Sequence, residues 1–107
     1  MRAEPYRSAL RPGETATIDL HARNFRSRSQ THRIEIHTPP GMIAEPAALE
    51  GSLDPHSKGF FPIRLRTASD AAPGVRIIGL DITLDGERYG EWFDCVVNIL
   101  PGVSGQP

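Results

Sequence analysis

The chain has 107 residues, 12 Lys and Arg, 13 Asp and Glu, and a formal net charge of −1. This length fits one domain with one modest core. A charge so near zero argues against a nucleic-acid partner, which needs a concentrated basic patch. No apolar run is long enough to span a bilayer, and the first residues lack the apolar segment of a secretory signal peptide.

The first third of the chain predicts two strands and a polar loop. Residues 5–10 are weakly extended, and Pro5 suits the start of a short edge strand. Residues 15–22 alternate, with apolar side chains on one face and mostly polar ones on the other, as in a strand buried on one side. Residues 24–31 are polar and irregular, so we interpret this arginine-containing segment as a solvated surface loop.

The middle of the chain predicts two longer strands, a short one at residues 42–44 and irregular segments between them. Residues 32–38 alternate, with the two isoleucines on the inward face. We interpret residues 45–51 as a connector, because a single helical turn is too short to be stable alone. Residues 61–67 alternate again. Pro62 cannot donate a hydrogen bond to a neighbouring strand, so it belongs at a sheet edge or faces outward.

A long hairpin closes the chain and organises the fold. Residues 75–84 form an alternating run, Asp85 and Gly86 follow, and a second alternating run covers residues 89–99. Asp-Gly between two such runs favours a type I′ turn, in which both central residues take positive φ. We expect the other strands to lie against this hairpin.

About seven short strands with turns between them, and no convincing helix, predict an all-β fold. The expected architecture is an Ig-like or fibronectin-III-like antiparallel β-sandwich. Alternation indicates that each sheet buries one face and exposes the other. We assign residues 1–100 to the sandwich domain and residues 101–107, which have linker composition, to a C-terminal tail.

Several landmarks occur in an order found in bacterial accessory domains. They are Pro12-Gly13-Glu14 before the alternating strand, Asn24 after it, Pro40-Gly41-Met42, Gly51-Ser52-Leu53 and Ala71-Ala72-Pro73-Gly74. Over roughly residues 10–99 the sequence resembles the NPCBM-associated, alpha-galactosidase-associated family of Ig-like domains. Two features depart from that family. Met42 stands where an aromatic residue is usual, and segment 90–94 is more distinctive than the usual polar final strand.

The resemblance implies a non-catalytic accessory module, a spacer or docking domain, within a larger bacterial protein. That protein would often be a secreted or cell-surface hydrolase acting on carbohydrates. A secreted, periplasmic or cell-surface location is favoured by the resemblance alone. Because one fold hosts many functions, the function has to be argued from the residues themselves.

The sequence shows no catalytic, cofactor-binding or metal-binding pattern. His21, His32, His37 and His56 lack paired ligand spacing, and we expect them on the surface. Carboxylates cluster along the last hairpin, but a small sandwich offers no cleft between two of them, as a glycosidase needs, and no calcium loop occurs. Cys95 falls on the apolar face of its strand, where a thiol behaves as a small hydrophobic group. We therefore predict a domain that is not an enzyme and needs no cofactor.

One surface is a candidate for interaction. If Phe93 faces the core, the alternating neighbours on its strand face outward, and Ig-like pairing puts residues 33–37 on the same sheet. An exposed tryptophan amid charges is typical of an interaction patch. The alternative is a bulge near Gly90 that turns the tryptophan into the core. The candidate surface comprises Trp92, Asp94, Val96, Arg33, Glu35 and His37.

The expected partner is a neighbouring domain of the same polypeptide or another protein. The alternative is a carbohydrate-binding module, with Trp92, Tyr89 and Phe60 as the aromatic platform. A small enzyme would need a cleft with convergent polar groups. A sheet-edge assembly subunit would pair a free strand with another chain, and Pro5 and Pro62 disfavour such pairing at their own strands.

Overall fold

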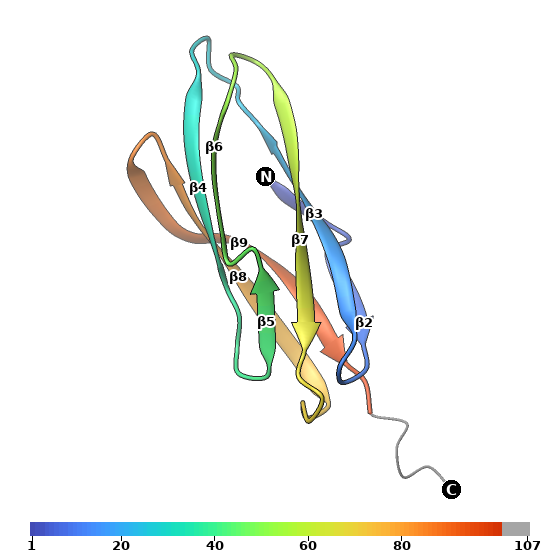
Figure 1. Cartoon of the computed structure of the whole chain (residues 1–107). Coiled ribbons are helices and arrows are strands. Elements are labelled where there is room, and N and C mark those ends of the chain that lie inside the picture. Colours follow the sequence, from blue (N-terminus) through green and yellow to red (C-terminus); the bar gives the residue numbers. More distant parts are fainter. Residues whose placement is uncertain (102–107) are drawn as a thin grey trace, which may run out of the picture.

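The computed structural model describes residues 1–101, which fold into two packed β-sheets (Figure 1). Within these residues no helix is long and apolar enough to cross a membrane. The predicted tail lies almost wholly at residues 102–107, outside the described part. The strands are β1 (Arg2–Glu4), β2 (Arg7–Leu10), β3 (Thr15–Arg23), β4 (Gln30–His37), β5 (Met42–Glu45), β6 (Ala48–Leu53), β7 (Lys58–Thr67), β8 (Gly74–Leu84) and β9 (Glu87–Ile99).

The predicted Ig-like sandwich is confirmed. One sheet has the strand order β1-β3-β7-β5, and the other has the order β2-β9-β8-β4-β6. Every pairing is antiparallel except that of β2 with β9, which is parallel. This parallel edge was not expected from the sequence, because it depends on a non-local contact at the start of the chain.

The structure has two strands more than the predicted seven, and one of the differences is a correction. Most of the connector predicted over residues 45–51 is strand, because β6 begins at Ala48 and pairs with β4 from Ala48 opposite Glu35 to Leu53 opposite Gln30. This segment has a weak local pattern, and its partner strand supplies the hydrogen bonds that make it a strand.

The turn of the long hairpin is as predicted. Asp85 has a φ of 49° and Gly86 a φ of 80°, and Leu84 pairs with Glu87 across them. The Asp85 side chain also accepts a hydrogen bond from the Thr31 backbone N–H at 3.0 Å. The turn is therefore fixed both by its own chemistry and by a contact with the start of β4.

Two bulges interrupt the β8–β9 ladder near its turn. The register steps from Leu80 opposite Phe93 to Asp81 opposite Glu91, so Trp92 has no partner residue on β8. A second step, between Ile82 and Thr83, leaves Tyr89 without one. Bulges re-aim side chains, and here they bring Glu91 to the same face as Asp81. A bulge near Gly90, which the sequence left open as the alternative, is present, and Gly90 has a φ of 78°.

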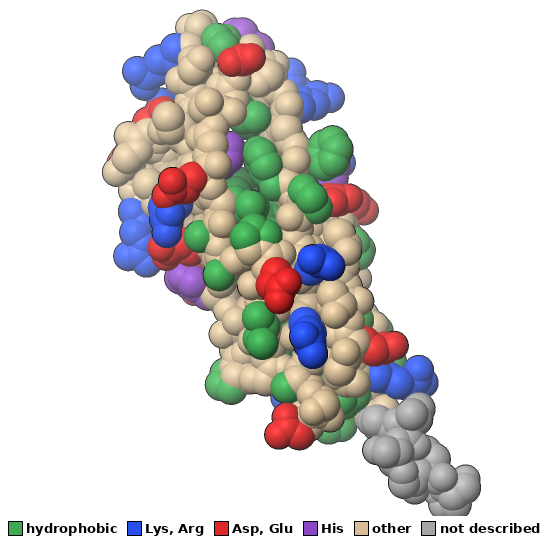
Figure 2. Space-filling view, in the orientation of Figure 1, with side chains coloured by type: hydrophobic (Ala, Val, Ile, Leu, Met, Phe, Trp, Pro, Cys, Tyr) green, Lys and Arg blue, Asp and Glu red, His purple; other side chains and the backbone are tan. Residues whose placement is uncertain are grey.

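The core lies between the sheets and is built mainly from aliphatic side chains. Cys95 is fully buried within it, as predicted, and burial raises the pKa of its thiol to about 11. Hydrophobic side chains also line the long side of the sandwich between β6 and β7, where β5 covers only part of the gap (Figure 2). The fully buried aliphatic residues include Ile18, Leu20, Ile34, Ile63, Leu65, Ile78, Leu80, Ile82, Val97 and Ile99.

Pro62 occupies a position in β7 that has a strand on one side only. It lies opposite Asp19 of β3, whereas β5 pairs with β7 only from Arg64 onward. The prediction of an edge-like position for this proline is confirmed. Its missing N–H also makes this stretch of β7 a poor template for an incoming strand.

Candidate functional site

The outer face of the five-stranded sheet, the side turned away from the other sheet, carries a linked group of charged side chains. The predicted interaction residues on β4 are here, and β4 and β9 do belong to the same sheet, separated by β8. At the centre lies Asp81 of β8, which is only 2% exposed. Glu35 of β4 pairs with Asp81 across the strands, and Glu91 pairs with it from β9.

Asp81 is held by Arg88. The Arg88 Nε lies 3.2 Å from both carboxylate oxygens, and an Nη donates to Oδ2 at 2.6 Å. This two-pronged contact is the strong form of an arginine–carboxylate pair. It lowers the pKa of Asp81 and raises that of Arg88. A buried carboxylate in this position is therefore ionised and charge-compensated.

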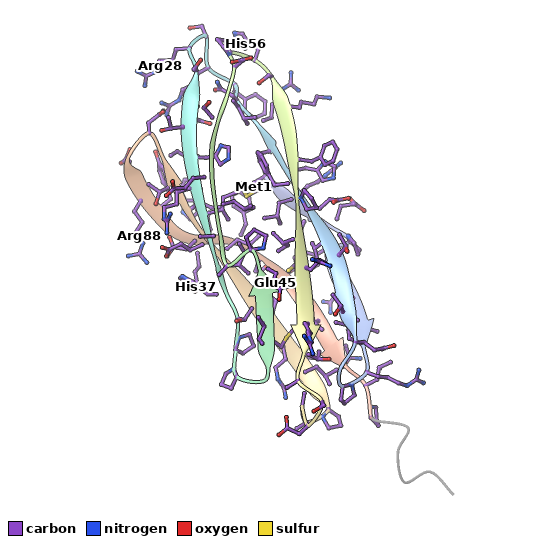
Figure 3. The ribbon with its side chains drawn as sticks, in the orientation of Figure 1. Met1, Arg28, His37, Glu45, His56 and Arg88 are labelled. Carbon is purple, nitrogen blue, oxygen red and sulfur yellow. The ribbon has the colours of Figure 1, made fainter. Side chains whose placement is uncertain are left out.

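His37 links β4 to β9 across β8. Its Nδ1 lies 2.9 Å from a carboxylate oxygen of Glu91, and the hydrogen bond to Glu91 raises the pKa of His37. The carboxylate passes over Gly79, where a Cβ atom would stand 1.9 Å from the Glu91 oxygen. Figure 3 places His37 and Arg88 together on this side of the molecule. The absent side chain at Gly79 is what lets Glu91 reach β4.

Arg33 completes the group at its β6 side. Its guanidinium donates to Glu35 at 3.1 Å and also to Glu50 of β6. These hydrogen bonds raise the pKa of Arg33, and the bond from Arg33 is the main cause that lowers the pKa of Glu35. Alternating charges of this kind are favourable for polar recognition but contribute little to stability when exposed.

Three of these side chains offer atoms at metal-ligand spacing. Single ligand atoms of Glu35, His37 and Asp81 lie within 4.8 Å of one another. Arg88 already occupies both oxygens of Asp81, however, and Glu91 already holds Nδ1 of His37. The arrangement is therefore an ion network, in which a cation at these three side chains would compete with Arg88 for Asp81.

Beside the charged group, the outer face of β8 exposes two aliphatic side chains. Val75 and Ile77 are 61% and 62% exposed. They lie beyond the point at which β4 stops pairing with β8, since the last pair joins His37 and Gly79. Val96, which we expected to be exposed, is buried. Its register places it between Ile77 of β8 and Arg7 of β2, so neighbours flank it on both sides.

Trp92 is exposed, although the bulge foreseen as the alternative is present. It is 61% exposed and packs on Tyr89, with 4.5 Å between the ring centroids. The Tyr89 hydroxyl donates to Glu87 at 3.0 Å, and this bond raises the pKa of Tyr89. The two residues inserted by the two bulges thus form one aromatic pair, with the rings tilted by 39° to each other.

The carboxylates of the final hairpin do not form one cluster, although Asp81 and Glu91 both approach His37. Asp94, one of the predicted surface residues, is half-buried and accepts a hydrogen bond from the Tyr6 hydroxyl at 2.7 Å, which raises the pKa of Tyr6. The others have different partners. Asp81 binds Arg88, Glu91 binds His37, Glu87 binds Tyr89, and Asp85 binds Arg26 and Thr31.

The surface position predicted for all four histidines is wrong for His32. That side chain is 7% exposed and packs against Phe61, with ring centroids 4.8 Å apart. Nothing within residues 1–101 forms a hydrogen bond with either ring nitrogen. Burial lowers its pKa. Alternation could have found it, because His32 stands two residues before the inward-facing Ile34.

Comparisons with known proteins establish the fold and no more. No family model matches this chain, and no curated protein matches it. A family 123 glycoside hydrolase of Clostridium perfringens matches 90% of this chain with a TM-score of 0.68 and 10% identity, and the match spans 23% of that chain. The MSP-domain-like protein SSP-19 of Caenorhabditis elegans matches 95% of this chain with a TM-score of 0.54 and 16% identity, covering 99% of its own chain. A chain of the chaperone–tip adhesin complex of CFA/I fimbriae matches 94% of this chain, with a TM-score of 0.53 and 12% identity over 55% of its length.

Proposed function

We propose that this domain is a non-catalytic accessory module that docks through the outer face of its five-stranded sheet. The docking partner is a neighbouring domain of the same polypeptide or another protein. In keeping with the sequence resemblance to the NPCBM-associated family, the parent is a larger bacterial protein, and a hydrolase is the class we favour.

The observation that carries this proposal is the pair of exposed aliphatic side chains on β8 beside the ion network. Val75 and Ile77 project from a face whose polar side chains are mostly paired with one another. An apolar centre with a polar rim is the usual anatomy of a protein interface. The ion network would determine how a partner is oriented on this surface more than how tightly it binds.

The hydrolase neighbour supports the idea of a module within a larger chain. In that protein, the matching fold accounts for 23% of the chain, so a sandwich of this kind occurs there beside other structure. In SSP-19, by contrast, the same fold is nearly the whole chain. The fold therefore occurs both as one part of a larger chain and as nearly a whole chain. For this protein, the docking surface favours the part of a larger chain.

Carbohydrate binding is the second candidate, and the aromatic pair of Trp92 and Tyr89 favours it. The exposed indole presents an apolar ring face. Beside it lies Tyr89, whose hydroxyl is bonded to the Glu87 carboxylate, a group that can accept hydrogen bonds. A titration of soluble glycans followed by the fluorescence of this single tryptophan tests the idea. A saturable change supports it, and a flat response across a broad panel counts against it.

Hydroxyl-radical footprinting tests the docking surface in the native gene product. Ile77 on the five-stranded sheet and Ile43 on the four-stranded sheet are 62% and 58% exposed in the isolated domain. They therefore form a matched pair with similar starting reactivity. The proposal predicts that Ile77 is oxidised several-fold less in the native product than in the isolated domain, with Ile43 unchanged. Equal oxidation of Ile77 in both samples would refute docking through this face.

A further inference from the structure

A cleft of about 250 Å³ opens between the two sheets at the end of the sandwich that carries the β3–β4 loop. Its walls come from both sheets and are largely aliphatic and aromatic. Ala22 of β3 lies on one side, and Leu53, Ile82 and Phe93 lie on the other. An engineered cavity of about 150 Å³ with similar apolar walls holds one benzene molecule. The cleft therefore has room for one aromatic ring with small substituents.

Two polar side chains of β4, Gln30 and His32, line this cleft. Gln30 is 9% exposed, and it lines the cleft. His32, two residues on and on the same inner face, is 7% exposed with both ring nitrogens unpartnered. Buried polar groups are normally hydrogen-bonded. The imidazole of His32 is not, within residues 1–101, and so it points to a missing partner.

The chemistry of these two groups specifies that partner. The Gln30 amide offers both a donor and an acceptor, and a neutral imidazole does the same. A hydroxyl group also donates and accepts, so it can satisfy either side chain.

The charge at the cleft is positive. Arg23 and Arg26 line it, and none of its lining residues is an aspartate or glutamate. Arg26 is already paired with Asp85, with 2.9 Å between the charged groups. Arg23 forms no ion pair within residues 1–101 and instead lies over the Phe25 ring, 5.1 Å from its centroid. It is the cation available to a bound carboxylate.

We propose that this cleft binds a small aromatic carboxylate that carries a ring hydroxyl. The ring lies between the sheets, the hydroxyl faces Gln30 and His32, and the carboxylate meets Arg23. This site is separate from the Val75 and Ile77 surface, so it stands or falls independently of the docking proposal.

A nuclear magnetic resonance titration with 4-hydroxybenzoate tests the site. We expect saturable shifts at the Gln30 side-chain amide and the Trp92 indole, both of which line the cleft. The expected dissociation constant is on the order of 1 mM or tighter. Benzoate lacks the hydroxyl and should bind about three- to tenfold more weakly, the loss that one hydrogen bond represents. 4-Cresol lacks the carboxylate and should bind about tenfold more weakly or worse, because it loses the charge-assisted contact with Arg23.

Three variants locate the binding. Arg23→Gln removes the cation from an exposed position, and Ala22→Leu fills the cleft. Both should weaken binding by about tenfold or more. Arg28→Gln, at the same end of the molecule (Figure 3) but outside the cleft, should bind like the parent. The absence of saturable shifts, or equal binding by Arg23→Gln and Ala22→Leu, would overturn the proposal.

Discussion

Two buried polar side chains near the same end of the sandwich have opposite surroundings. Asn24 is fully buried, and its Nδ2 lies within hydrogen-bond distance of the carbonyl oxygens of Arg28, Leu53 and Asp54, at 2.7, 3.2 and 3.1 Å. Its Oδ1 accepts from the Arg26 N–H at 3.0 Å. His32 is nearly as buried but has no hydrogen-bond partner within residues 1–101.

The difference separates a structural polar group from an available one. Asn24 ties the β3–β4 loop to the end of β6, so every polar atom of its side chain is used for the fold. His32 contributes its ring to packing against Phe61 and leaves its nitrogens unused. Since an unpaired buried polar group costs free energy, the fold tolerates His32 rather than depending on it.

The largest expected effect is at Asn24. Asn24→Ala should lower the free energy of unfolding by about 3 kcal/mol, because several backbone groups lose their partner at once. Asn24→Asp is the matched variant. It keeps the acceptor for Arg26 but cannot donate to the carbonyls, so it should also be clearly destabilised. Urea denaturation measures both, and a loss under about 1 kcal/mol for Asn24→Ala would show that the loop is held by other contacts.

At His32, by contrast, a substitution is expected to stabilise the protein. His32→Leu removes two unsatisfied nitrogens and keeps an apolar group of similar size in the core. The free energy of unfolding should rise by about 1 kcal/mol. The same denaturation experiment reads this out, and His21→Leu is the control, because His21 is only half-buried and stacks on Phe60 at the surface. A destabilised His32→Leu protein would mean that the imidazole does have a partner.

His32 and His37 have pKa values shifted in opposite directions, so they should change the pH dependence of the free energy of unfolding in opposite directions. Burial lowers the pKa of His32 from 6.5, so the unfolded chain takes up a proton first and stability falls as the pH drops through about 6.5. Glu91 raises the pKa of His37, so its contribution is present at low pH and is lost as the pH rises through its native pKa. Between about pH 7 and about pH 5, His32→Leu should therefore lose less stability than the parent, and His37→Ala should lose more. If the free energy of unfolding changed with pH equally in the parent and both variants, the environments described for His32 and His37 would be wrong.

The smallest effect is expected at Trp92, which borders the cleft but is mostly exposed. Trp92→Ala should change the free energy of unfolding by about 0.5 kcal/mol or less. Thermal unfolding by circular dichroism measures it. Loss of the folded state would instead make Trp92 a core residue. It would then be neither a carbohydrate-binding residue nor a residue at the rim of the cleft.

Much of the fold could be predicted because it depends on local patterns. Alternation fixed the inward faces of most strands, and the Asp85-Gly86 pair fixed the hairpin turn. β6 and the parallel β2–β9 edge were missed, because their partners are distant in sequence and their own patterns are weak. The register of β8 and β9 was predicted only up to the bulges, which no periodicity announces.

The candidate site was predictable only in outline. Arg33, Glu35 and His37 could be assigned to the sheet that carries Trp92, because alternation and sandwich topology are regular. Their partners could not. Glu91 reaches His37 only because a bulge turns it outward and Gly79 leaves space, and both depend on the three-dimensional register. The inward position of Gln30 and His32 followed from alternation but conflicted with their polarity.

As a module of a larger protein, this domain would belong to a polypeptide much longer than 107 residues. The most direct test is the size of the native gene product, by immunoblot of the source organism with an antibody against this domain. If the domain is a module of a larger protein, the band lies far above the 11.7 kDa of this chain. A band at 11.7 kDa would contradict it and make the domain a free-standing protein, with ligand binding in the cleft as its leading function.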